Sequence, residues 1–214
     1  MAKTKIAILI SGRGSNMQAL IDACAAEDYP AEIVLVVSNN PGAKGLERAA
    51  LADIPTAVVD HRGYDSREAF EETVHNLVKA SGAQYVFLAG FMRILTPWFV
   101  GQWRDRLVNI HPSLLPCFTG VHTHERAIEA GVKLHGCTVH YVRPEMDDGP
   151  IIGQAAVPVL PGDTPDTLAE RVLAAEHRLY PACVKLVCEG KARVVGEVVR
   201  LSSTTSGMLL NPGA

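Results

Sequence analysis

The sequence of 214 residues contains no hydrophobic run long enough to cross a membrane, because a spanning helix needs about 20 consecutive apolar residues. The apolar run near its start, residues 6–10, is also too short for a secretory signal, which needs roughly 7–15 such residues. Polar Ser11-Gly12-Arg13 follows that run directly. We therefore expect neither a membrane span nor a leader peptide.

Cysteine is scarce and neither sign of charge is in excess. The five cysteines are odd in number and lack the paired spacing of a zinc site. Such a set is typical of reduced thiols, so we expect a cytoplasmic location. The 20 Lys and Arg residues face 23 Asp and Glu residues, a net charge of −3. Because a phosphate backbone normally selects a basic face, nucleic acid is disfavoured as a partner.

Apolar residues are plentiful, at 48% of the chain, which excludes intrinsic disorder. At about 150 residues per domain, the length favours one domain, and no repeat or linker divides the sequence. A chain of this length buries roughly 70% of its unfolded surface, so it needs no disulfide or structural metal to fold. We expect a single domain over residues 1–201 and a mobile, low-complexity tail over residues 202–214.

Short β-branched runs alternate with longer amphipathic stretches in the first half of the sequence. The predicted strands are apolar on both faces, which is typical of a parallel sheet covered by helices on both sides. The pattern therefore predicts an α/β, Rossmann-like fold with a mostly parallel sheet. The predicted strands are 5–10, 33–37, 56–59 and 85–89, and the predicted helices are 16–27, 44–53 and 66–81.

The second half is less regular, but it also contains strand and helix patterns. The predicted strands are 107–110, 137–142 and 151–159, with helices near 124–130 and over 164–189. We expect Asp163 or Thr164 to cap the long helix. Pro181 lies within that helix, where proline kinks the chain or starts a turn.

A glycine-rich turn, Ser11-Gly12-Arg13-Gly14-Ser15-Asn16, follows the first predicted strand. Glycines permit a tight turn, and the N–H groups at a helix N-terminus attract a phosphate. The turn lacks the third glycine of a dinucleotide motif and the lysine of a P-loop. It therefore favours a phosphate monoester on a small substrate. In the alternative interpretation, the glycines only shape the turn and Ser15 caps the helix.

Asn109 and His111 lie two residues apart at the end of a predicted strand, just before Pro112. Residues two apart in a strand point to the same side, so an amide and an imidazole converge there. Such a pair could stabilise the oxyanion that forms when an amine attacks a carbonyl. Open α/β sheets bind ligands at this end of their strands. The alternative is structural, with the asparagine bonded to loop backbone and the histidine packed beneath it.

Asp147 and Asp148 lie in a loop that continues into Gly149-Pro150. Turn chemistry alone accounts for Asp148. A functional Asp147 would pair with the imidazole of His111, favouring its protonated form, or would pass a proton through water. This hypothesis requires that the two side chains meet in the fold.

Four further histidines suggest a metal site at first sight, since His122 and His124 could chelate an ion. Metal sites usually add carboxylates or cysteines at matching spacing, with partners that orient the ligands. The sequence has no such set, so we expect no metal. His124 lies near a predicted helix start and His135 just before a predicted strand, which are ordinary places for capping or packing; the fourth histidine is His140.

Together with three longer motifs, these features resemble the phosphoribosylglycinamide formyltransferases, folate-dependent enzymes of purine biosynthesis. The motifs are LAGFMRIL at residues 88–95, NIHPSLLP at 109–116 and HTH at 122–124. The resemblance runs from about residue 6 to about residue 201. It implies a formyltransferase-type fold and transfer of a formyl group from 10-formyltetrahydrofolate, a co-substrate, to the amine of glycinamide ribonucleotide in IMP biosynthesis.

The resemblance also implies roles for individual residues. The catalytic residues would be Asn109, His111 and Asp147. The substrate phosphate would bind Gly14, Ser15 and Asn16, and Glu176 would contact the glycinamide part. The folate side would be formed by Arg67, Met92, Arg93, Ile94, Leu95, Asn109, Arg143, Pro144, Glu145, Met146 and Asp147. The implied partners are the two small-molecule substrates, with the protein a monomer or homodimer.

Three alternatives share part of this pattern. A formyltetrahydrofolate deformylase has the Asn-x-His and Asp-Gly-Pro motifs but transfers the formyl group to water, and it normally carries an N-terminal regulatory domain. A methionyl-tRNA formyltransferase carries a further domain for tRNA, for which this chain has neither the length nor the basic charge. A non-catalytic nucleotide-binding module would keep the glycine-rich turn but would not need Asn109, His111 and Asp147 together.

Overall fold

The computed structural model describes residues 2–202, which form two compact units. Unit 1 consists of residues 2–109 and 141–144, and unit 2 consists of residues 110–140 and 145–202. The expected mobile tail, residues 202–214, lies outside the described residues except for Ser202. The single domain over residues 1–201 stays a prediction.

Unit 1 is built on a parallel sheet. Its strands are β1 (Thr4–Ile10), β2 (Ala31–Ser38), β3 (Thr56–Val58), β4 (Tyr85–Leu88) and β5 (Leu107–His111), the last of which continues into unit 2. Their order is β3-β2-β1-β4-β5, and every neighbouring pair is parallel. The predicted strands are confirmed to within one or two residues.

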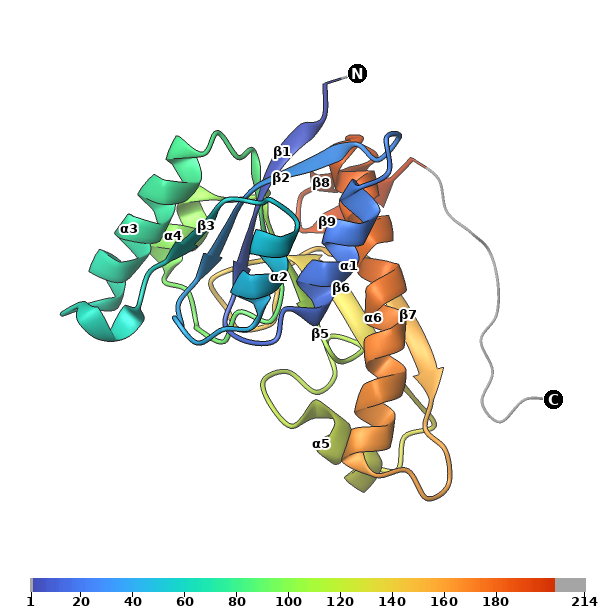
Figure 1. Ribbon diagram of the computed structural model, residues 1–214. Coiled ribbons are helices and arrows are strands. Elements are labelled where there is room, and N and C mark those ends of the chain that lie inside the picture. The colour runs from blue at the N-terminus through green and yellow to red at the C-terminus, as the bar shows by residue number, and fades with distance from the viewer. Residues whose placement is uncertain (1, 203–214) are drawn as a thin grey trace. The chain divides into compact units, whose positions relative to one another are not determined.

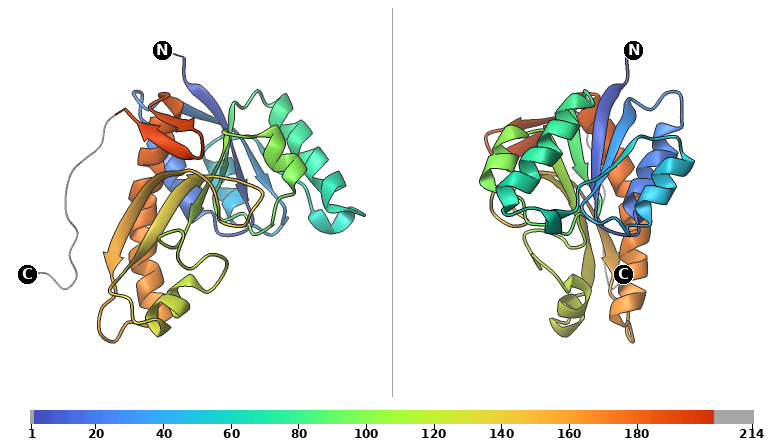
Figure 2. Two further views of the ribbon diagram at one scale, coloured as in Figure 1. Left: turned by 180° about the vertical axis from the view of Figure 1, so that it is seen from behind. Right: turned by 60° about the vertical axis from the view of Figure 1, so that its left-hand side comes forward.

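Helices cover both faces of the unit 1 sheet (Figure 1; Figure 2, right). They are α1 (Ser15–Cys24) and α2 (Gly45–Leu51) on one face, with α3 (Arg67–Ala80) and α4 (Pro97–Gln102) on the other; a 3-10 turn, η1, spans His61–Gly63. Ala7 and Leu9 of β1 join the core beneath α3 and α4, whereas Ile6, Ile8 and Ile10 are fully buried on alternate positions. Successive residues of a strand point to opposite faces, so β1 contributes apolar side chains to both. The prediction of helices on both faces is confirmed.

Helix α4 was not predicted. It has only six residues, too few to show a helical period, but Thr96 caps it and Pro97 occupies its first turn. A capping threonine followed by proline is a helix-start signal. Phe99 and Val100 then anchor the helix in the core.

Unit 2 pairs an antiparallel hairpin with helices. The hairpin is β6 (Leu134–Tyr141, whose last residue belongs to unit 1) with β7 (Ile151–Pro158), and the helices are α5 (Thr123–Glu129) and α6 (Pro165–Cys188). Its core combines Ala127, Cys137, Val157, Leu168 and Val172 from these four elements. A second hairpin, β8 (Ala192–Val195) with β9 (Val198–Leu201), was not predicted.

Helix α6 tests two predictions, one on its cap and one on the proline within it. Thr164 is the N-cap, and its hydroxyl and backbone exchange hydrogen bonds with Thr167 in a capping box. Of the two outcomes expected at Pro181, the turn is excluded, since the helix runs through it to Cys188, and the kink stays a prediction. Burial of Tyr180 and Cys183 on either side holds this segment helical despite the amide that proline lacks. Within residues 2–202, no helix combines the length and apolarity that crossing a membrane requires.

Candidate active site

The end of β5 brings a histidine into a buried position. Asn109 is half-buried and His111 is buried, and the two lie on the same side of the strand because they are two residues apart. The Nε2 atom of His111 lies 3.1 Å from the carbonyl oxygen of Phe118. Its Nδ1 atom lies 3.3 Å from Oδ1 of Asp147. The contact that the Asp147 hypothesis requires is therefore present.

Asp147 is held from two directions. While Oδ1 faces His111, its Oδ2 accepts a hydrogen bond of 2.6 Å from the backbone N–H of Gly120. Its side chain is only 13% exposed, and its backbone has a left-handed φ of 52°. Aspartate tolerates that conformation better than most residues. By contrast, Asp148 is exposed and its amide closes a turn with Glu145, as the turn interpretation predicts.

Both ring nitrogens of His111 thus face oxygen atoms. A carbonyl oxygen and a carboxylate can only accept hydrogen bonds, whereas a neutral imidazole offers just one N–H. Each ring nitrogen therefore has an oxygen acceptor within reach. The geometry at the end of β5 therefore places the imidazole between a carbonyl oxygen and a carboxylate.

Sequence reasoning missed Phe118 and Gly120 as partners of these side chains. Both act through their backbones, so the identity of their side chains carried no signal for the role. Both also have a positive φ, of 54° and 78°. Such a conformation is common at glycine but unusual at phenylalanine, and only the folded chain reveals it.

The glycine-rich turn forms the start of α1. Gly14 is the N-cap, with a left-handed φ of 71°, and no side chain caps the helix. Ser15 is the first helical residue, so the interpretation of Ser15 as the cap is wrong. A Cβ at position 14 would lie 2.8 Å from the Cα atom of Gly45, so glycine is needed here for packing as well as for conformation.

The residues expected on the folate side occupy different settings. Within unit 1, Met92 and Ile94 are exposed and Leu95 is buried in the loop after β4, while Arg67 is exposed at the start of α3. Arg143 is buried, and its guanidinium pairs with Asp105 at 2.8 Å. Of the remaining residues, Arg93 is half-buried and Pro144 is exposed, both in unit 1. Glu145 and Met146 are exposed in unit 2.

Glu176 is buried on α6, near the thiol of Cys137. Burial and, to a smaller extent, the charge of Glu176 raise the pKa of Cys137 to about 12. A carboxylate held inside unit 2 can neutralise a cationic group of a ligand, which is the kind of contact that the resemblance implies for it. All five cysteines are free.

The four additional histidines lie in different settings. His124 and His135 meet edge to face, with ring centroids 5.3 Å apart, and burial lowers the pKa of both, that of His135 to about 4. His135 lies inside β6 and not before it, because the strand starts at Leu134. His122 is exposed beside Glu125, and His140 is buried on β6. Across residues 2–202, no three His, Cys, Asp or Glu side chains gather as a metal site would require.

Comparison with known proteins identifies the family. The formyl transferase family matches residues 4–184. Phosphoribosylglycinamide formyltransferase of Escherichia coli (strain K12) is 45% identical over 189 residues, which cover 88% of this chain and 89% of that one. The trifunctional purine biosynthetic protein adenosine-3 of Drosophila pseudoobscura pseudoobscura is 51% identical over 198 residues, 92% of this chain. This chain spans only 14% of that protein's length and 19% of its counterpart in Gallus gallus.

A solved structure shows the same fold. Glycinamide ribonucleotide transformylase 1 from Symbiobacterium toebii superposes with a TM-score of 0.91 at 44% identity, covering 93% of this chain and 94% of that one. The likeness confirms the mostly parallel α/β formyltransferase fold predicted from the sequence. On the family match and these identities, the chain belongs to the formyl transferase family.

Proposed function

We propose that this chain transfers the formyl group of 10-formyltetrahydrofolate to the amine of glycinamide ribonucleotide, a step of purine biosynthesis. The single observation that carries the proposal is the contact between His111 and Asp147 at the end of β5. These are two of the three positions to which the family resemblance gives catalytic roles. The near full-length match to the Escherichia coli enzyme supports the same activity.

In the proposed reaction, the substrate amine attacks the formyl carbon and forms a new C–N bond. The carbonyl oxygen becomes an oxyanion, which the imidazolium of His111 and the amide of Asn109 stabilise. The bond from the formyl carbon to folate N10 then breaks. A proton leaves the attacking nitrogen and reaches N10, and Asp147 carries it with ordered water. No enzyme-bound intermediate is needed, so the exposed Cys117 is given no role.

Substrate binding follows from local electrostatics. The N-terminus of α1, at Gly14, Ser15 and Asn16, offers backbone N–H groups and the positive end of a ten-residue helix to the substrate phosphate. The buried carboxylate of Glu176 serves the glycinamide part. The folate co-substrate contacts the segment from Met92 to Leu95, together with the other folate-side residues named above. Metal takes no part, and the protein acts as a monomer or homodimer in the cytoplasm.

An absorbance assay tests this function against its alternatives. Purified protein is mixed with 10-formyl-5,8-dideazafolate, whose spectrum changes on loss of the formyl group, with and without glycinamide ribonucleotide. Turnover that depends on the amine is the expected result. Equal turnover without the amine would identify a deformylase, and no turnover at all would identify a nucleotide-binding module.

A further inference from the structure

Ser11, the first residue of the glycine-rich turn, binds the loop that follows β4 at two points. Its backbone N–H donates to the carbonyl of Gly90 at 3.1 Å. Its hydroxyl accepts a hydrogen bond of 2.8 Å from the backbone N–H of Met92. Ser11 and Met92 are 81 residues apart in sequence. One residue therefore joins the turn expected to bind phosphate to the start of the segment expected to bind folate, both within unit 1.

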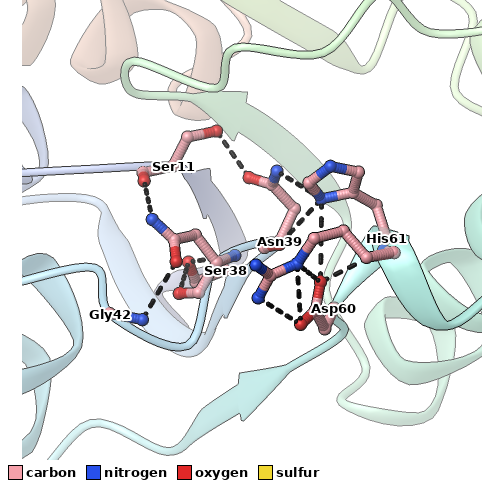
Figure 3. Close-up of polar contacts among 8 residues, drawn as sticks. Ser11, Ser38, Asn39, Gly42, Asp60 and His61 are labelled. Carbon is pink, nitrogen blue, oxygen red and sulfur yellow. Dashed lines mark hydrogen bonds and ion pairs between the residues drawn. The ribbon is translucent and has the colours of Figure 1, made fainter.

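A hydrogen bond to Asn39 fixes the orientation of the Ser11 hydroxyl, as Figure 3 shows. It donates to Oδ1 of Asn39 at 2.5 Å, which leaves its lone pairs for Met92. Asn39 is buried just after β2, and its Nδ2 lies 3.2 Å from Nδ1 of His61 in η1. Because the amide is held by a second element, the serine oxygen has one preferred direction in which to accept.

A buried carboxylate holds the other end of the same segment. Glu71 on α3 is 1% exposed. Its Oε1 accepts a hydrogen bond of 2.8 Å from the backbone N–H of Thr96, and its Oε2 accepts another from the Thr96 hydroxyl. A carboxylate inside a protein is costly unless such donors compensate it. Because Glu71 lies outside the proposed catalytic residues, the burial of its carboxylate needs another explanation.

Between these two attachments, the segment shows apolar side chains to solvent. Met92 is 69% exposed and Ile94 is 59% exposed. Leu95, which follows Ile94, is buried in the core. Exposed large apolar side chains on a short, anchored segment are typical of a binding surface. Because both ends of the segment are already fixed, the segment loses less conformational entropy when a ligand binds to it.

We propose that Ser11 and Glu71 are positioning residues that hold residues 92–96 in the shape that binds the folate co-substrate. The inference rests on the proposed function and extends it to two residues without an assigned role. Ser11 acts on both substrates, because it belongs to the glycine-rich turn and also anchors Met92. Glu71 acts on the folate side alone, because its contacts are with Thr96.

Kinetics of four variants test these roles. Glu71→Ala is expected to raise the KM for folate roughly tenfold, since a buried N–H loses its acceptor, with kcat and the KM for the ribonucleotide nearly unchanged. Glu71→Gln restores the folate KM, because its amide can accept from the Thr96 N–H and donate to the Thr96 hydroxyl. Ser11→Ala raises both KM values. Glu72→Ala, at the exposed neighbouring position on α3, is the matched control and changes neither.

Hydrogen exchange of single amides provides a readout that does not depend on turnover. The Thr96 amide is expected to exchange faster in Glu71→Ala, and the Met92 amide faster in Ser11→Ala, each by roughly tenfold. If Glu71→Ala does not fold, the Ser11→Ala variant and its Met92 amide decide the matter. An active enzyme whose folate KM is the same in all variants would overturn the positioning roles. A wild-type chain without turnover would instead refute the proposed function.

Discussion

At the scale of single residues, the site depends on the different contacts that the two carboxylate oxygens of Asp147 make. One faces the imidazole of His111 and the other accepts from the backbone of Gly120. The carboxylate is thus fixed in direction beside the ring. An anion held in this way stabilises an imidazolium, which is the form of His111 that can assist an oxyanion in the proposed reaction.

Replacement of either side chain is expected to lower kcat by roughly 10²–10⁴, the range for losing acid–base or oxyanion assistance. Asp147→Asn is the sharper test, because the amide oxygen can still accept from Gly120 while the negative charge beside His111 is lost. His111→Ala removes the ring itself. Steady-state kinetics with both substrates measures the effect. Asp148→Asn, in the exposed turn next to it, serves as the control, and normal turnover of Asp147→Asn would exclude the proton-carrying role.

At the scale of elements, α5 and β6 bring together a half-buried and a buried histidine, His124 and His135, that the proposed reaction does not use. The rings of His124 and His135 meet edge to face, and the ring of Phe118 packs against His135. Burial favours the neutral form of each ring. These histidines therefore make the packing of unit 2 sensitive to pH.

The sign of that sensitivity follows from the pKa of His135, which burial lowers from 6.5 to about 4. Between these values the unfolded chain binds the additional proton, so the free energy of unfolding rises as pH increases from 4 to 6.5. His135→Gln should reduce this rise by about 1–3 kcal/mol, since one pKa unit corresponds to about 1.4 kcal/mol. Urea unfolding at pH 4.5 and pH 7 measures it. An unchanged difference between the two pH values would contradict this role of His135.

The attachments of the segment after β4 show how elements cooperate in unit 1. Thr96 ends that segment, caps α4 and donates to Glu71 of α3. A single threonine therefore fixes a loop, a helix start and a buried carboxylate together. The local sequence indicates the cap, but the pairing with Glu71 depends on the packing of α3 and α4 against one sheet face.

At the scale of the whole molecule, the chain passes between the two compact units three times, after residues 109, 140 and 144. The units are therefore not separable by one cut in the chain. We expect them to unfold together, in keeping with the prediction of one domain. Small single domains usually unfold in one cooperative transition.

Two probes that belong to different units can test this cooperativity. Both tryptophans, Trp98 and Trp103, lie in unit 1, whereas the buried thiols of Cys137 and Cys183 lie in unit 2. Tryptophan fluorescence and thiol reactivity should report the same denaturant midpoint. Midpoints that differ would show that the units are separate domains.

Much of the fold follows from local patterns. Strands with apolar residues on both faces predicted a parallel sheet, and Asp163 or Thr164 was the predicted cap of α6, of which the structure selects Thr164. The missed elements have a local reason: α4 and the β8–β9 hairpin are too short to show a period. At Pro181 the sequence left a kink or a turn open, and the structure excludes the turn.

The sequence by itself determined the alternation of strands and helices, the glycine that α1 needs at position 14, and the motifs that identify the family. These are local properties, set by periodicity and by the conformations that each residue permits. Only the tertiary structure decided that Asp147 meets His111, and that Ser11 and Glu71 hold the two ends of one loop. Such contacts join residues 25 to 81 positions apart, and much of their chemistry lies in backbone groups that every residue carries.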